Sequence, residues 1–386
     1  MKIGLNFLIA YLVFIFQGLT APLGSVMIME IGEKYSVDIS SISYIYALGI
    51  VGGGIAAVFS GFLLESLGKR KLIFMGIIIA FAAGAAITVS HYLMILAVGM
   101  FLFGVSSWFL VAVGNYVIIS YYQGEQRSSQ LNLLNFFFSI GALAAPLMAG
   151  FMLARNIPWE LVFLAPFALL VILSILAYSP AFVTTEFPSS IPRKKCQQNT
   201  AEKWNMDIYL IGAGLGFYCM LELSYTSWII VHLRENLAVD IVAASLVLTA
   251  FYICQAIGRL ISGFIVKYVA LNIYIIACAC IGLITTLFMI FSKNYMIVLY
   301  LTILMGLGIA SLYPSILSYG TLQVKNPSSH LTTFFLSSGV IGSIVVMLLT
   351  SFLKQHFGVL ACIASGVFAA AMVMLLIGIT KIRLDK

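Results

Sequence analysis

The chain has 386 residues, of which 62% are hydrophobic and only 9% are charged. Soluble globular domains carry about 25% charged residues, so this composition excludes a soluble enzyme and a disordered chain. The net charge of +7 does not indicate a nucleic-acid partner, because the basic residues are scattered through short loops between apolar segments and read as topology signals.

Long, continuous apolar segments predict an all-α integral membrane protein, since a transmembrane helix needs about 20 apolar residues. The length leaves room for about twelve such spans and little else. We expect the first apolar run to be an uncleaved span rather than a signal peptide, because it continues past Pro22 without a clear cleavage site. The expected spans are residues 5–30, 40–65, 72–89, 92–121, 129–154, 159–178, 206–233, 240–265, 271–291, 294–319, 329–352 and 358–381.

One polar, proline-containing gap divides these spans into two sets of six. It has too little apolar content to fold alone and predicts a linker. We therefore expect an N-terminal six-helix half over residues 1–178, a cytoplasmic linker over 179–205 and a C-terminal six-helix half over 206–386. The tripeptide Ser-Gly-Phe ends the second span of each half, at 60–62 and at 262–264. Such a plan is typical of transporters that bind substrate between two halves.

The basic residues predict the orientation of the chain. With a cytoplasmic N-terminus, 14 of the 20 Lys and Arg residues fall in inside segments and 5 in outside segments, while Arg259 lies within a span. Because cytoplasmic loops are enriched in Lys and Arg, this bias predicts that both termini are cytoplasmic. We expect a multi-pass protein of a bacterial inner (cytoplasmic) membrane.

The loop after the second span predicts a gating element. Gly61 allows close approach of helices, and Gly68 permits a tight turn. Between them Glu65 can meet a helix N-terminus or a basic group of the other half, and Lys69 and Arg70 follow the turn. A contact of this kind would hold one conformation and break when the transporter changes state.

Two ionisable residues lie inside predicted spans. Glu222 falls midway through the seventh span, where an acid costs at least about 2.5–3.5 kcal/mol on insertion scales. It therefore needs a partner, a proton or a wet cavity, and it is the candidate for proton coupling or substrate binding. Arg259 in the eighth span is close enough to the cytoplasmic end to extend toward it, and we expect a gating role.

These patterns resemble the major facilitator superfamily. The loop at 61–71 is similar to the signature loop of that family, although Glu65 and Ser66 stand where an aspartate and an arginine are usual. The stretches 131–142 and 312–318 are similar to the fucose/proton symporter branch, and 124–129 to its TsgA-like members. The resemblance covers essentially the whole chain and implies a fold of 12 transmembrane helices in two halves that alternate access to a central site.

The resemblance further implies a substrate cavity lined by spans one, four, seven and ten. Amides, hydroxyls and aromatic rings in such a cavity suit a neutral, polyhydroxylated molecule. The acidic pair of the fucose symporter is missing from spans one and four, so fucose transport is not implied. The expected cavity residues are Gln17, Thr20, Asn115, Asn135, Tyr218, Tyr225, Gln255, Ser311 and Tyr313.

The sequence thus predicts a secondary active transporter, driven by protons, of a small polar organic solute such as a sugar. An efflux antiporter for a cationic or amphipathic compound is an alternative. Its binding groups would be Glu222, Trp108, Trp228 and Tyr218. A non-transporting sensor on the same scaffold is a further alternative, and an enzyme lacks a catalytic constellation. We expect no cofactor and no metal, and a monomer in the lipid bilayer, because the site needs no second chain.

Overall fold

The computed structural model is entirely helical over the residues it describes, which are 2–122, 124–180, 182, 204–266, 268–324 and 329–384. The polar linker, with its basic triplet at 193–195, therefore lies almost wholly outside the described residues. The helices are α1 (Lys2–Thr20), α2 (Leu23–Tyr35), α3 (Ile39–Val89), α4 (Leu93–Tyr121), α5 (Gly124–Ala154), α6 (Trp159–Leu164), α7 (Phe167–Tyr178), α8 (Met206–Thr226), α9 (Ile229–Leu237), α10 (Ile241–Ile265), α11 (Leu271–Phe291), α12 (Tyr295–Ile309), α13 (Leu312–Thr321), α14 (Ser329–Phe357) and α15 (Val359–Leu384).

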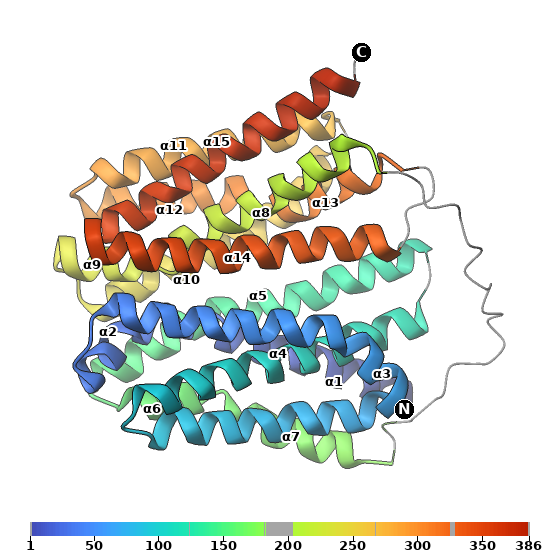
Figure 1. Ribbon diagram of the computed structural model, residues 1–386, viewed down its shortest axis with the longest axis vertical. Coiled ribbons are helices and arrows are strands. Elements are labelled where there is room, and N and C mark those ends of the chain that lie inside the picture. The colour runs from blue at the N-terminus through green and yellow to red at the C-terminus, as the bar shows by residue number, and fades with distance from the viewer. Residues whose placement is uncertain are drawn as a thin grey trace.

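Helix α3 contains two of the expected spans. Its 51 residues would extend about 77 Å if straight, more than twice the thickness of the hydrocarbon core. Gly68 has φ 77° and ψ 161°, which is not helical, and the chain folds back there (Figure 1). In the described residues ten helical segments are long and apolar enough to cross a membrane, when α6–α7, α8–α9 and α12–α13 are each taken as one. The bent pair α1–α2 makes an eleventh span. Division of α3 at Gly68 gives the twelve crossings that hydropathy predicts.

Four expected spans are each broken into two helices. The breaks fall between α1 and α2, α6 and α7, α8 and α9, and α12 and α13. Pro22 and Pro166 immediately precede α2 and α7, because proline lacks an N–H group and clashes with the preceding turn. The axes of α1 and α2 differ by 43°. Broken helices free backbone groups inside a membrane protein, and these need partners elsewhere.

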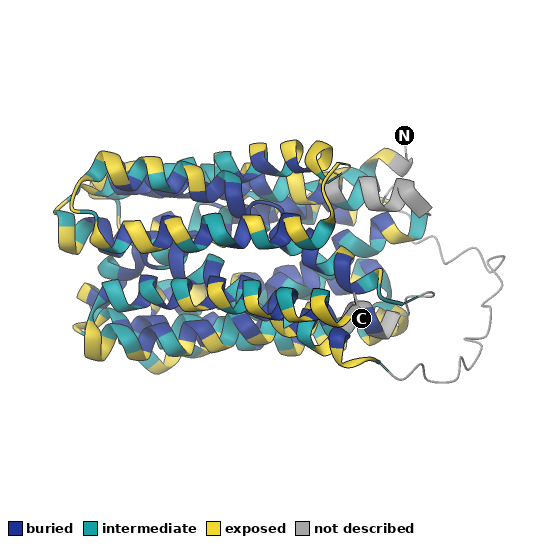
Figure 2. Cartoon of the chain, turned by 90° about the horizontal axis from the view of Figure 1, so that it is seen from above, coloured by how far each residue is buried: buried dark blue, intermediate teal, exposed yellow. Residues whose placement is uncertain are grey.

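The helices gather in two groups, α1–α7 and α8–α15, which we call the N-terminal and C-terminal halves (Figure 1). Helix α3 packs against α14 and helix α5 against α10, so these pairs join the halves. The start of α1 and the end of α15 lie at the same end of the bundle, which we call the linker end; α2, α6 and α9 lie at the far end. Exposed residues cover the outer faces, and many are large and apolar, as a surface in contact with lipid requires (Figure 2).

Glycines bring helices together at equivalent crossings of the two halves. Gly18 of α1 touches Gly141 of α5, and Gly216 of α8 touches Gly342 of α14. At each crossing an added Cβ would meet backbone atoms of the facing helix. Small residues are how transmembrane helices approach closely, since lipid supplies no hydrophobic drive for association.

We predict that Gly68→Ala destabilises the protein by about 1–3 kcal/mol, because the backbone region of Gly68 is essentially restricted to glycine. No atom of the described residues lies within 4 Å of the position of an added Cβ, so a steric clash with them would not contribute. Thermal unfolding in detergent measures the effect. Gly61→Ala is the matched control, because Gly61 is helical and equally uncrowded. Equal melting temperatures for the two variants would contradict the turn geometry.

Candidate functional site

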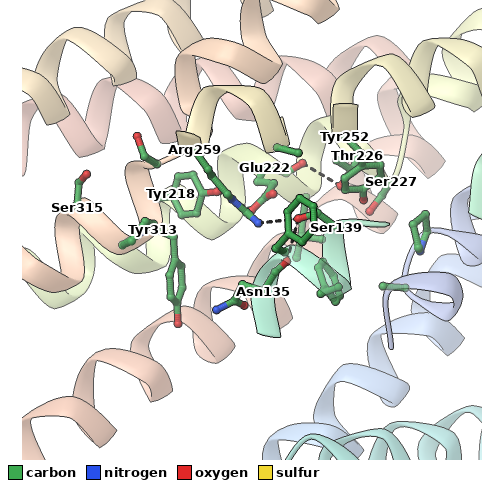
Figure 3. Close-up of a pocket in the computed structure, with 18 of the residues that line it drawn as sticks. Asn135, Ser139, Tyr218, Glu222, Thr226, Ser227, Tyr252, Arg259, Tyr313 and Ser315 are labelled. Atoms are coloured by element: carbon green, nitrogen blue, oxygen red, sulfur yellow. Dashed lines mark hydrogen bonds between the residues drawn. The ribbon is translucent and has the colours of Figure 1, made fainter. Parts of the chain in front are cut away.

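A cavity of about 980 Å³ lies between the two halves. On one side it is lined by α2, α3 and α5, and on the other by α8, α10 and α13. Hydroxyl, amide and aromatic side chains make up much of its wall, with one carboxylate, Glu222, and one guanidinium, Arg259 (Figure 3). The cavity wall thus mixes polar and apolar side chains, and it is close to electrically neutral when both groups are charged.

Glu222 is held by two hydrogen-bond donors. The hydroxyl of Tyr218, one turn earlier on α8, donates to Oε2 at 2.8 Å. The amide Nε2 of Gln255 on α10 donates to Oε1 at 2.6 Å. Both oxygens of the carboxylate are therefore satisfied, which is the condition for placing an acid at this depth.

The same amide connects Glu222 to Arg259. Gln255 is 2% exposed, and its Oε1 accepts from Arg259 Nη2 at 3.3 Å. The amide therefore presents its carbonyl to the cation and its NH₂ group to the anion, the orientation that satisfies both neighbours. Among the described residues, no ion pair joins Glu222 directly to Arg259, and Gln255 lies between them.

Arg259 also spans the interface between the halves. Its Nη1 donates at 3.0 Å to the hydroxyl of Ser139 on α5 (Figure 3). Its Nε donates at 3.2 Å to the carbonyl of Ala310. That carbonyl is free because its partner in a regular helix would be the N–H of residue 314, which is a proline. The break in the tenth span thus provides a backbone acceptor for the buried guanidinium.

Five residues predicted from the sequence line the cavity: Glu222, Tyr218, Asn135, Ser311 and Tyr313. Ser311 shares a hydrogen bond with Tyr274 of α11, so its hydroxyl is tied to its own half. The rings of Tyr218 and Tyr313 lie 6.1 Å apart between centroids. Arg259, expected near the cytoplasmic gate, lies in the same cavity.

Five other predicted cavity residues lie outside its lining. The hydroxyl of Thr20 bonds the carbonyls of Phe16 and Gln17, and Gln17 belongs to the same helix, α1. Tyr225 is fully buried and shares a 2.6 Å hydrogen bond with Thr302. Asn115 belongs to α4, none of whose residues lines the cavity. Gln255 does not line the cavity but donates a hydrogen bond to Glu222, which does.

The predicted gating loop makes contacts within its own half. Arg70 donates at 2.6 Å to the carbonyl of Tyr178, and the ammonium group of Lys69 lies 5.1 Å from the ring centre of Phe182. Glu65 is exposed, and the ion pairs of the described residues do not include it. The positions of an added Cβ at Gly61, and at Gly263 in the other half, are open. Among the described residues, the contact expected across the halves is therefore not made in this conformation.

Contacts between the halves at the far end were not foreseen from the sequence. Arg234 of α9 donates at 2.5 Å to Glu30 of α2, and Ser351 of α14 donates at 2.7 Å to Ser43 of α3. All four residues lie within or beside ordinary hydrophobic patterns. Their role follows only from their pairing, over 204 residues for Arg234 and Glu30 and over 308 for Ser351 and Ser43. The far end is thus fastened by polar contacts, whereas the described part of the linker end does not make the predicted one.

The comparisons with known proteins agree with this arrangement. Residues 6–206 match the family model described as Major Facilitator Superfamily. The chain belongs to the Major Facilitator Superfamily. It is a multi-pass membrane protein and a secondary transporter, not an enzyme, as the sequence predicts.

Relatives in sequence cover nearly the whole chain. A Protein TsgA homolog of Yersinia enterocolitica is 25% identical over 374 residues, which cover 96% of this chain and 93% of the relative. A Protein TsgA homolog of Yersinia pestis is 25% identical over 373 residues, or 95% and 93% of the two chains. The resemblance to TsgA-like proteins is confirmed.

Two solved structures share the fold. A D-xylose-proton symporter superposes with a TM-score of 0.77 at 13% identity and covers 97% of both chains. A bacterial homolog of the human lysosomal transporter Spinster, in an inward-facing and occupied conformation, has a TM-score of 0.69 at 13% identity and covers 98% of this chain and 95% of its own. These likenesses confirm the predicted fold.

We predict that the double variant Ser43→Cys with Ser351→Cys forms a disulfide that blocks solute flux. The two hydroxyl oxygens are 2.7 Å apart, so thiols at these positions are close enough to bond with little backbone movement. Gel mobility after mild oxidation, together with flux in proteoliposomes before and after reduction, tests this. Each single variant is the control. Full flux in the oxidised double variant would show that the far end does not need to open.

Proposed function

We propose that the chain is a proton-coupled secondary transporter that moves a small polar organic solute through the cavity between its halves. The observation that carries this proposal is the chain of contacts Tyr218–Glu222–Gln255–Arg259–Ser139, which joins an acid in the membrane interior to the opposite half. A coupling site has to sense a proton and pass its effect to the interface that moves. In this network Glu222 can take up the proton, and Ser139 belongs to the opposite half.

Glu222 is the proton site in this proposal. The hydroxyl of Tyr218 donates to the charged carboxylate, and the same hydroxyl can rotate to accept from the protonated form. Both states of Glu222 can therefore be satisfied without moving α8. Protonation removes the negative charge that compensates Arg259, and this loss of charge is how the proton would affect the contact with Ser139.

Alternating access follows from the two ends of the bundle. The Glu30–Arg234 and Ser43–Ser351 contacts fasten the far end, and the loop with Glu65, Lys69 and Arg70 would fasten the linker end in the opposite state. With the termini and the linker in the cytoplasm of a bacterium, the present conformation is open inward. The cavity is completed by one chain, which supports a monomer in the inner membrane.

Uptake by symport is favoured over efflux of a cationic compound. Trp108, one of the aromatic residues expected to bind such a compound, lies beside Gly53 and not in the cavity. Arg259 lines the cavity and would repel a cation. The fold shared with a D-xylose-proton symporter is consistent with symport of a hydroxylated solute. A sensor without flux remains the outcome if every bound compound fails to cross the membrane.

We predict that Glu222→Gln abolishes solute-dependent proton movement in proteoliposomes, because glutamine keeps the size of the side chain but cannot exchange a proton. The measurement is the internal pH signal on addition of sugars, polyols, organic acids, amino acids and cationic dyes. Glu33→Gln, which alters an exposed carboxylate at the far end of α2, is the matched control and should retain the signal. A signal of normal size in the Glu222 variant would refute its role as the proton site.

A further inference from the structure

We propose that the solute is a hydroxylated anion with a single carboxylate group, and that Arg259 binds this carboxylate when Glu222 is protonated. The inference rests on the proposed function and adds the chemical class of the substrate and the residue that selects it. It differs from the neutral sugar that the sequence predicts.

The first step is that Arg259 has hydrogen-bond donors to spare. A guanidinium has five N–H donors, and three of them have acceptors here: Ala310 O, Ser139 Oγ and Gln255 Oε1. All three acceptors are neutral. Among the described residues, one N–H on Nη1 and one on Nη2 have no acceptor, and Arg259 lines the cavity. Carboxylates accept hydrogen bonds from the two terminal nitrogens of an arginine, and such pairs are among the strongest in proteins.

The second step is the charge balance of the site. The titratable or charged groups facing Glu222 are Tyr218 and Cys219 on α8, Tyr252 and Arg259 on α10, and Tyr313 on α13. The described parts of α5 and α14 that reach the cavity carry no charged side chain, and the basic residues of α15, Lys381 and Arg383, lie in its last turn at the linker end. Arg259 is therefore the one cation of the site, among the described residues, and it supports one negative charge.

That single charge can be supplied in two ways. Without solute, charged Glu222 compensates Arg259 through Gln255. Protonation of Glu222 leaves Arg259 uncompensated in an apolar protein, which is costly unless an anion enters. A carboxylate solute restores the balance, whereas a neutral sugar does not. Proton and solute would thus bind together, which is the basis of symport with one proton for each carboxylate.

The third step is the presence of unused donors for hydroxyl groups in the same cavity. The indole Nε1 of Trp228 is fully buried and has no hydrogen-bond partner in the described residues, and the same holds for the hydroxyl of Tyr46. Both residues line the cavity, one from each half. Both donor atoms are covered in this conformation, so they would meet acceptors of the solute only after the cavity wall rearranges on binding. A hydroxylated chain attached to the carboxylate has such acceptors.

The test compares gluconate with sorbitol, which has the same six carbons and a hydroxyl group in place of the carboxylate. Binding to the purified protein is measured by thermal shift and calorimetry from pH 5.5 to 8.5. Solute-dependent proton movement is measured separately in proteoliposomes. Lactate and glucuronate are tested as further anions, and glucose and xylose as further neutral solutes. We expect Arg259-dependent binding of at least one anion, with affinity that falls as pH rises because deprotonated Glu222 takes over the charge of Arg259.

Three variants separate binding from coupling. Arg259→Gln should weaken binding of the anion by about 10- to 100-fold, since it removes hydrogen bonds to a charged group. Arg259→Lys keeps the charge and should lose less, which also guards against misfolding of the glutamine variant. Glu222→Gln should bind the anion with an affinity that no longer changes with pH, and should retain solute exchange without net proton movement.

Different results would contradict the inference and the proposed function. If no carboxylate binds, or if binding is equal in wild type and Arg259→Gln, Arg259 does not select an anion. If a neutral solute drives proton movement that Glu222→Gln abolishes, while every carboxylate is inert, the solute class is wrong but the proposed transport function stands. If anions bind through Arg259 and none crosses the membrane, the proposed function fails while the assignment of the binding group survives.

Discussion

An acid and a base in the middle of an apolar protein are stable only if each compensates the other, and this requirement organises the centre of the molecule. Glu222 and Arg259 are separated by one glutamine amide that bonds both. The intervening amide keeps the two charges from forming a tight pair, so each remains able to exchange its partner. A direct ion pair would be harder to break and would hold the site in one state.

Most of the fold could be predicted from the sequence, because the spans are long, apolar and separated by polar residues. The turn between the second and third spans was anticipated at Gly68, and the structure gives it the positive φ that glycine allows. The breaks within four spans were not anticipated. Hydropathy averages over a window of residues and does not register where a helix loses its hydrogen bonds, even where Pro22, Pro166 or Pro314 marks the position.

The site was predicted less completely, for a geometric reason. An intramembrane acid is recognisable from sequence because a carboxylate in an apolar span is costly whichever way its side chain faces, so Glu222 was found. Which way an uncharged polar residue faces depends on the rotation of its helix, about 100° for each residue, and on what packs against it. Hence Tyr225 and Asn115 were expected in the cavity and lie elsewhere, and Gln255 proved to act between two charges. The contacts of Glu30 and Ser43 depend on partners more than 200 residues away.

The glycine crossings have a mechanical meaning. Ser139, which holds Arg259 across the interface, lies two residues before Gly141, where the backbones of α5 and α1 touch. No side chain there can move aside to absorb a displacement. Helices α5 and α1 therefore move together when the hydrogen bond from Arg259 to Ser139 is made or broken. In the other half Gly216, six residues before Glu222, ties α8 to α14, which bears Ser351 of the far-end contact. Each crossing acts as a rigid joint, and a change of charge at the centre can become a tilt of helices at both ends.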